Sequence, residues 1–162
     1  TQRVVLRVAQ ALGDADAGPA LWQRLQARVA AAAARVPPAL RGQTVYFEVA
    51  AAPYAAGEAS FIGQTLARLG LANVVSAARG PFPKLNPEFG ERAQPALIMA
   101  TASAVADMPA RPGWAGLRAL RDKRHCGFAA EPWDALVRPG PRLAEAAEAL
   151  ADCLEGLDRQ AR

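Results

Sequence analysis

The sequence is short of the residues on which most catalytic sites depend. Its 162 residues include one histidine and two cysteines, and aromatic side chains make up 6% of the chain. It contains no GxGxxG dinucleotide motif, no GxxxxGKS/T phosphate-binding loop and no GxSxG nucleophile elbow. The single histidine, His125, lacks the thiol–histidine spacing of a nucleophile–base pair, so we interpret it as a structural or surface residue. These absences indicate a binding protein that has no cofactor, and not an enzyme.

Long apolar runs and blocks of one charge are also missing. No segment is long and apolar enough to span a membrane. The net charge of +4 comes almost entirely from arginines scattered among acidic residues, since Lys84 and Lys123 are the only lysines. Nucleic-acid binding requires cations gathered on one face, so we expect no nucleic-acid partner. The sequence contains no signal peptide and begins at Thr1 instead of a methionine, which is compatible with a processed or truncated product.

Two features leave more than one interpretation open. Cys126 and Cys153 lack metal-ligand spacing and could form one disulfide or remain two buried thiols. Glu48, inside a predicted strand, could be a buried acid with a role of its own. A carboxylate paired with an arginine at the end of the strand is the interpretation that we favour.

The chain is long enough, and apolar enough at 52% hydrophobic residues, to form one globular domain with a sizeable core. Residues 3–12 are predicted to be a helix that stops at Gly13. A longer helix is predicted to begin at Gly18 and to run to about Arg35, because apolar residues recur at i, i+4 and i+8 and an alanine run follows. Pro37 and the proline after it end this helix.

After residue 42 the pattern changes to an alternation of strands and helices. Strands are predicted at residues 44–49, 73–76, 96–101 and 126–130, and helices at residues 60–69, 87–94, 114–121 and 142–157. Ser60 can cap the first of these helices and Gly70 suits the position after its end. This alternation predicts an α/β fold of three layers, Rossmann-like, with a mainly parallel sheet covered by helices on both faces.

In such a sheet, ligands bind beyond the carboxyl ends of the strands. The loops predicted there span residues 50–57, 77–85, 102–112 and 131–141. They carry three rings, one acid and one base, which fits a mostly apolar ligand with a few polar groups. The candidate ligand-binding residues are Tyr54, Phe82, Trp133, Asp134 and Arg138. The alternative is that the rings cap the ends of the core.

One of these loops holds an aromatic ring between two prolines. Pro81 and Pro83 restrict the backbone on both sides of Phe82, so this loop is predicted to present the ring. Glu88 follows in the first turn of the next helix, which Asn86 can cap. The helix dipole alone favours an acid there, by roughly 0.3–1 kcal/mol, so Glu88 could have this local role or dock against a partner.

Several runs, taken in order, carry a resemblance to a known family. They are residues 45–49 (VYFEV), 53–54 (PY), 81–83 (PFP) with the later Glu88, 95–98 (PALI), 114–120 leading to Arg121 and Arg124, and 138–142 (RPGPR). In this order and spacing, the chain resembles the C-terminal lobe of the solute-binding proteins of ABC importers for vitamin B12, haem and iron-siderophores. The resemblance covers roughly residues 1–158.

The resemblance implies a two-lobed binding protein of which this chain holds one lobe. In the family, a rigid long helix joins two α/β lobes that hold the ligand between them, and residues 19–36 would be that helix. Residues 1–40 would form a helical segment that includes it, and residues 41–162 the C-terminal ligand-binding lobe, with the N-terminal lobe absent. The protein would be periplasmic, secreted by a signal peptide absent from this chain, and monomeric when full length.

The resemblance also implies roles for single residues. Phe82 falls on a position whose ring packs against the ligand, and Asp134 and Arg138 fall on polar pocket positions. Glu88 falls on a glutamate that docks against arginines of the membrane permease. In relatives, a cysteine that would pair with Cys153 stands at the position that Leu69 occupies here. A disulfide in this chain would therefore have to use Cys126.

The ligand implied is a small-molecule metal chelate: cobalamin, haem or a ferric siderophore. Two other classes stay open. A Rossmann-like enzyme domain would turn over a nucleotide-linked substrate, and a structural module built on the same lobe would bind a protein partner but no ligand.

Overall fold

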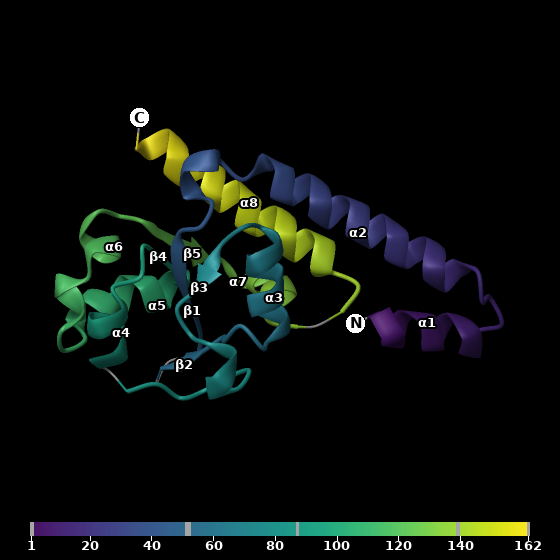
Figure 1. Ribbon diagram of the computed structural model, residues 1–162, viewed down its shortest axis with the longest axis horizontal. Coiled ribbons are helices and arrows are strands. Elements are labelled where there is room, and N and C mark those ends of the chain that lie inside the picture. Colours follow the sequence, from purple (N-terminus) through teal and green to yellow (C-terminus); the bar gives the residue numbers. More distant parts are fainter. Residues whose placement is uncertain (1, 51–52, 87, 139, 162) are drawn as a thin grey trace.

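A computed structural model describes residues 2–50, 53–86, 88–138 and 140–161. It shows a mixed α/β protein in which helices lie on both sides of a mostly parallel sheet, and a helical hairpin projects from one end (Figure 1). The predicted fold class is therefore confirmed. None of the described helices is long and apolar enough to cross a membrane.

The N-terminal part forms the hairpin of α1 (Gln2–Ala11) and α2 (Ala17–Arg35). The chain reverses at Gly13, whose φ of 78° lies in the left-handed region that glycine adopts without a steric penalty. Asp14 then accepts a hydrogen bond from the backbone N–H of Ala17 at 3.0 Å, so α2 begins slightly before the predicted Gly18. Both predicted helices are confirmed.

The sheet has the order β3–β1–β4–β5, with all four strands parallel: β3 (Ala72–Asn73), β1 (Thr44–Ala50), β4 (Leu97–Thr101) and β5 (His125–Phe128). A two-residue strand, β2 (Tyr54–Ala55), folds back antiparallel to β1. The strand predicted at residues 73–76 is shorter than expected. The Asn73 side chain accepts a hydrogen bond from the Val75 N–H at 2.9 Å, which turns the chain out of the sheet.

Successive residues of the strands point to opposite faces, and each face has its own helical layer. Phe47 and Met99 belong to the core beneath α2, α3 (Phe61–Arg68), α7 (Ala130–Val137) and α8 (Leu143–Gln160). Tyr46 and Ile98 lie on the other face, with α4 (Glu88–Ala93), α5 (Ala102–Asp107), α6 (Arg118–Arg121) and the short 3₁₀ segments η3 (Met108–Ala110) and η4 (Trp114–Gly116). Two further 3₁₀ turns are η1 (Pro38–Leu40) and η2 (Ala77–Arg79).

The predicted cap of α3 is confirmed: Ser60 Oγ accepts a hydrogen bond from the Gly63 N–H at 2.9 Å, and Gly70 after the helix has a φ of 83°. The helix predicted at residues 114–121 is instead divided into η4 and α6. Leu117 has extended backbone angles between them, with φ −64° and ψ 124°.

Two loops predicted at the carboxyl edge were wrong, because residues 102–107 form α5 and residues 130–137 form α7. The Thr101 side chain caps α5 by accepting the Ala104 N–H at 3.1 Å. Pro132 is compatible with α7 because it stands in the first turn, where a backbone N–H has no partner within the helix anyway.

The C-terminal part of α2 lies beside the N-terminal part of α8 (Figure 1). Leu25 and Val29 of α2 belong to the same buried cluster as Leu150 and Leu154 of α8. Arginines of α2 pair with acids of α8 along the outer rim: Arg28 with Glu148 at 2.8 Å, and Arg35 with Glu155 at 3.0 Å and with Asp152. Exposed pairs of this kind contribute little each, so the apolar seam stabilises the contact most.

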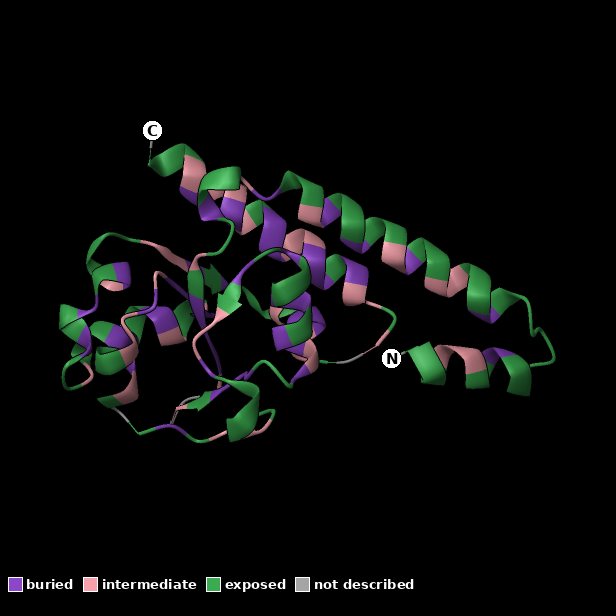
Figure 2. Ribbon diagram, viewed as in Figure 1, coloured by how far each residue is buried: buried purple, intermediate pink, exposed green. Residues whose placement is uncertain are grey.

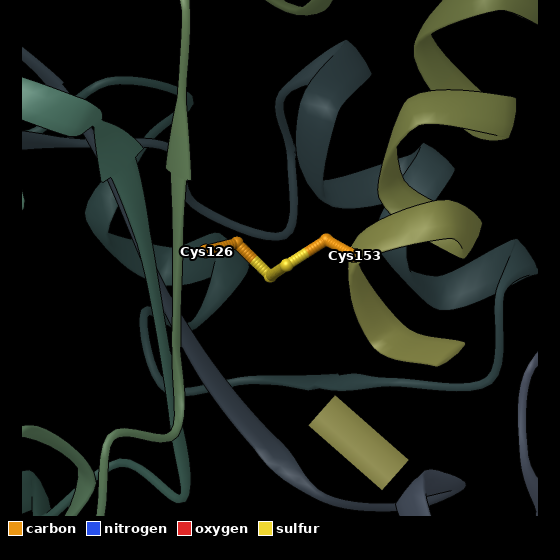
Figure 3. The surroundings of a disulfide bond; sticks show 2 residues. All are labelled: Cys126 and Cys153. Atoms are coloured by element: carbon orange, nitrogen blue, oxygen red, sulfur yellow. A yellow bond between two sulfur atoms is a disulfide. The ribbon is translucent and has the colours of Figure 1, made fainter. Parts of the chain in front are cut away.

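A disulfide joins Cys126 in β5 to Cys153 in α8, with the two Cα atoms 6.0 Å apart (Figure 3). Of the two arrangements left open by the sequence, the chain therefore has the single disulfide. It uses Cys126, as the resemblance requires, and it ties the edge strand of the sheet to the helical layer beneath.

Candidate functional site

At the carboxyl edge of the sheet, the loop that carries Phe82 is bonded to β2. The backbone N–H of Ala55 donates to the carbonyl of Pro83 at 3.1 Å, and the N–H of Leu85 donates to that of Pro53 at 3.0 Å. The N–H of Gly57 adds a bond of 2.9 Å to the carbonyl of Pro81. These bonds hold the loop as an extra antiparallel segment on β2, so the loop is stiff for reasons beyond its prolines.

The two strands of this segment bring Tyr54 and Phe82 to one place. Tyr54 forms an antiparallel bridge with Lys84, so these two side chains leave the segment on the same face, and Phe82, two residues from Lys84, shares that face. Tyr54 is 41% exposed and Phe82 40% exposed, unusual fractions for large rings in a packed protein. The prediction that this loop presents its ring is confirmed.

Phe61, which the sequence analysis did not single out, belongs to the same surface. It is the first residue of α3, and its ring meets Phe82 edge to face with the centroids 5.9 Å apart. It directly follows the Ser60 cap, at the start of the helix, and this position near the carboxyl edge could have been predicted from the sequence. We call Tyr54, Phe61 and Phe82 the ring surface.

The backbone is tightly packed beneath the ring surface. A Cβ atom at Gly57 would lie 2.6 Å from the carbonyl oxygen of Gly80, which is closer than any side chain permits. Gly80 itself has a φ of 87°. Both glycines are therefore required for the two loops to approach each other this closely.

Trp133 has a different role from the exposed rings. It is half-buried on α7 and stacks on Phe47 of β1, with an interplanar angle of 6° and centroids 5.5 Å apart. It packs against the main core, as the alternative interpretation of the rings proposed. Trp133 also lines a hollow of about 190 Å³ beyond the ends of β1 and β4, so it stays at the candidate site.

The hollow is also bordered by a buried ion pair. Glu48, 1% exposed, accepts hydrogen bonds from Arg111 Nη1 at 2.6 Å and Nη2 at 2.8 Å, and from the Tyr46 hydroxyl at 3.0 Å. This confirms that Glu48 is paired with an arginine. The sequence could not tell which one, because Arg111 lies 63 residues further on in an irregular segment.

Burial and hydrogen bonding shift the titration of this group. Burial, with the neighbouring Glu48 carboxylate, raises the pKa of Tyr46, and the hydrogen bond to Glu48 raises the pKa of Arg111. The Arg111 guanidinium also lies over the Trp114 ring, 4.9 Å from its centroid. Tyr46 therefore stays a neutral hydroxyl donor and Arg111 stays a cation.

Asp134 and Arg138 are paired with each other. The Arg138 Nε lies 2.8 Å from a carboxylate oxygen of Asp134, and Arg142 Nη1 lies 3.5 Å from the other oxygen. The Arg138 side chain is 76% exposed. The two residues predicted as polar pocket positions are thus neighbours on the surface, and their role toward a ligand stays a prediction.

Glu88 is the first residue of α4 and is exposed. Its backbone N–H donates to Asn86 Oδ1 at 2.9 Å, so Asn86 caps this helix as predicted. Pro87 lies outside the described residues. The position agrees with both interpretations of Glu88, the local one and the docking one, and docking stays a prediction.

The described part of the chain offers no group of three or more histidine, cysteine, aspartate or glutamate side chains placed to hold a metal ion. What the edge does offer is an apolar surface of rings, with the hollow beside Trp133 as a second, more polar area. Such an edge can bind one side of a ligand that is broad and mostly apolar.

Comparison with known proteins agrees with this arrangement. No curated protein matches the chain. Among solved structures, it is similar to a possible iron-binding periplasmic solute-binding protein from Staphylococcus epidermidis, with 21% identity and a TM-score of 0.80 over 93% of this chain and 60% of that one. It is similar to the periplasmic haem-binding protein BhuT, with 27% identity and a TM-score of 0.71 over 96% and 62% of the two chains.

A third similar structure is the periplasmic vitamin B12 binding protein BtuF of Vibrio cholerae, with 19% identity and a TM-score of 0.65 over 91% of this chain and 55% of that one. The chain thus spans less than two thirds of the length of each of these proteins. A family model described as periplasmic binding protein matches residues 2–127. Together with the parallel sheet and the ring surface at its carboxyl edge, this match shows that the chain belongs to the periplasmic binding protein family.

Proposed function

We propose that this chain is the C-terminal lobe of the substrate-binding component of an ABC importer. The protein captures a metal chelate, cobalamin or a related haem or ferric siderophore, in the periplasm and delivers it to the membrane permease. The observation that supports this most directly is the ring surface: Tyr54 and Phe82 are exposed at the carboxyl edge, on backbone that is fixed by hydrogen bonds.

The ring surface is half of a binding site. It is open to solvent on the side away from the sheet, whereas a ligand pocket normally covers most of its ligand. The solved structures that the chain resembles are longer, since the chain spans 55–62% of those named above. A second lobe facing this edge supplies the other wall of the pocket.

The helix α1 carries another surface that lacks cover. Figure 2 shows exposed residues along α1. Val4 and Val8 of α1, with Leu12 just beyond its end, recur at i, i+4 and i+8 and are 63%, 52% and 78% exposed. They line an apolar groove of about 470 Å³ between α1, the start of α2 and Pro141. An apolar stripe of this kind belongs against another part of a protein, and the second lobe is its proposed cover.

The visible absorption spectrum of the two-lobed protein, purified from its source, tests the proposal. Corrinoid, haem and ferric chelates have distinct bands, so a bound ligand identifies itself. Absence of any such band, together with no binding of added cobalamin, haemin or ferric siderophore, would overturn the proposed function. Turnover of a nucleotide-linked substrate would favour an enzyme instead.

The 162-residue chain alone tests the half-site. Losing roughly 200 Å² of apolar contact at ~25 cal/mol/Å² removes ~5 kcal/mol, which is three to four decades of affinity. We expect micromolar or weaker binding and self-association through the α1 stripe, with Val8→Glu restoring a monomer. Nanomolar binding by a monomer would mean that the site is complete within this chain.

Docking to the permease is tested by Glu88→Arg in the two-lobed protein. The exposed position predicts unchanged folding and ligand affinity, whereas placing a cation against arginines of the permease slows and weakens association. Asp122→Arg, the same charge change at the opposite edge of the sheet, is the control. Unchanged uptake by Glu88→Arg in a transport assay removes Glu88 from the docking role.

A further inference from the structure

We propose that Lys84 determines specificity, by binding a carboxylate of the ligand beside the ring surface. The inference rests on the proposed function and narrows it: the ligand is an apolar chelate that carries carboxylates, as a porphyrin does, and not a chelate whose periphery is uncharged.

Lys84 lies beside the exposed rings. Its bridge to Tyr54 puts both side chains on one face of the two-stranded segment, and Phe82 lies two residues away on that face. The next residue, Leu85, points the opposite way and is 5% exposed in the core. The exposed Lys84 side chain therefore leaves the segment on the same face as Tyr54 and Phe82, so a ligand stacked on these rings covers it.

Lys84 has no carboxylate within ion-pair distance among the residues that the structure describes, whereas two other cations of this edge are matched. Arg111 is bonded to Glu48 through both terminal nitrogens, and Arg138 is paired with Asp134. Arg79, the other cation of the same loop, lies over the Phe89 ring, 5.3 Å from its centroid.

The hollow beside Trp133 is unsuited to an anion. Glu48, Asp107 and Arg111 all line it, so acids outnumber bases there. The Thr101 and Ser103 hydroxyls in the same wall can bind neutral polar groups. An anionic group of the ligand is therefore favoured at Lys84 and disfavoured beside Trp133, which also fixes the orientation of the ligand.

A bound ligand changes the hydration of the Lys84 ammonium group. A ligand stacked on the rings removes water from Lys84, and an ammonium that loses water without gaining a partner costs free energy. A carboxylate repays this cost with a charge-assisted hydrogen bond, and a neutral ligand does not. Lys84 thus selects against neutral chelates as well as for anionic ones.

The test compares two ligands that share the same iron porphyrin: haemin, which has two carboxylates, and its dimethyl ester, in which both are methyl esters. Both are titrated into the two-lobed protein, in dilute dimethyl sulfoxide, with cobalamin, which carries amides and no carboxylate, as a reference. The variants are Lys84→Gln, Lys84→Arg and, as a matched control, Lys123→Gln, which changes the only other lysine of the chain.

We expect Lys84→Gln to weaken haemin binding about tenfold and to leave the dimethyl ester unchanged, because only the charge-assisted bond is lost. Lys84→Arg keeps haemin affinity within roughly threefold, and Lys123→Gln changes nothing. Equal effects of Lys84→Gln on both porphyrins, or no effect on either, overturn the role of Lys84.

The same titrations separate this inference from the proposed function. If the wild-type protein binds cobalamin or a neutral ferric siderophore and not haemin, the proposed function stands and the carboxylate preference is wrong. If it binds none of these chelates, both are wrong.

Discussion

The two edges of the sheet differ in what they expose. At the amino edge, a hollow of about 260 Å³ has three charged residues, one amide and no aromatic ring in its lining, which consists of Gln43, Pro95, Ala96, Arg118, Ala119, Asp122 and Arg124. At the carboxyl edge, Tyr54, Phe61 and Phe82 form a surface of rings, although aromatic residues are only 6% of the chain. Both edges are concave and both carry cations, so neither property identifies the ligand edge.

The edges also differ in how their charges are held. Arg111 at the carboxyl edge is part of a buried network with Glu48 and Tyr46. Arg124 at the amino edge donates from Nε to one backbone carbonyl, that of Ala96, at 3.3 Å. A functional edge combines exposed apolar area with a rigid support, and that combination is what distinguishes it from a solvated edge.

The largest expected effect comes from breaking that support. Arg111→Ala leaves the Glu48 carboxylate, 1% exposed, without its cation, and we expect the free energy of unfolding to fall by about 3 kcal/mol in urea titrations. The matching change at the other edge, Arg124→Ala, loses one ordinary hydrogen bond and costs about 1 kcal/mol. Equal losses at the two edges contradict the comparison. Glu48→Leu with Arg111→Leu should recover much of the stability, because no charge is then left buried.

The disulfide gives the next largest effect and lies between the edges. Replacing Cys126 and Cys153 by alanine opens a link between residues 27 apart in sequence, and we expect a loss of about 3 kcal/mol in unfolding free energy. Both cysteines lie away from the ring surface, so ligand affinity of the two-lobed protein should stay the same. Loss of affinity in the double variant, at a temperature where it is folded, would show that β5 positions the ligand edge.

Phe82→Ala sharpens the comparison within one edge. The ring is 40% exposed and contacts Phe61, so its removal should lower stability less than the loss of a core ring, whereas ligand affinity in the two-lobed protein should fall by about 1–3 kcal/mol. Phe89→Ala is the control, because that half-buried ring packs in the core of the second face and its loss should reduce stability but not affinity. Isothermal titration measures the ligand affinity of both variants, and urea unfolding measures their stability. The same pattern in both variants would mean that Phe82 is a core residue.

Much of this arrangement could be predicted from the sequence, because it rests on local signals. The alternation of strands and helices predicted the parallel sheet, and the two prolines around Phe82 predicted an exposed ring. The helices at residues 102–107 and 130–137 were missed because these residues were predicted to be loops, and both stretches lie close to a proline, Pro109 and Pro132. A proline in the first turn, or just beyond the end, of a helix is compatible with that helix.

What could not be predicted depends on contacts between distant parts of the chain. The pairing of Glu48 with Arg111 and the contact of Phe61 with Phe82 join segments whose register no local pattern specifies. The stacking of Trp133 on Phe47 is of the same kind, and it packs one side of a predicted ligand-binding ring against the core. Side-chain partners across the sheet follow from packing, and packing is fixed only in three dimensions.

The smallest expected effect concerns the amino edge, where β5 begins with His125, the only histidine of the chain. Burial lowers the pKa of His125 below its usual 6.5, and the nearby Lys123 lowers it further. Because the folded-state pKa is lower, the unfolded chain binds a proton more tightly than the folded one. The free energy of unfolding should therefore be unaffected above about pH 7 and should fall as the pH drops through 6.5 toward the folded-state pKa. Glu155 adds its own loss only near and below pH 4.5, because the hydrogen bond from Arg35 lowers its pKa from that value.

Urea unfolding between roughly pH 5 and pH 7 isolates this slope, because in that window histidine is the side chain that ordinarily titrates. His125→Gln should flatten it, and Lys123→Gln should reduce it in part, because one cause of the lowered pKa is then gone. A slope that survives in His125→Gln would place the titrating group elsewhere.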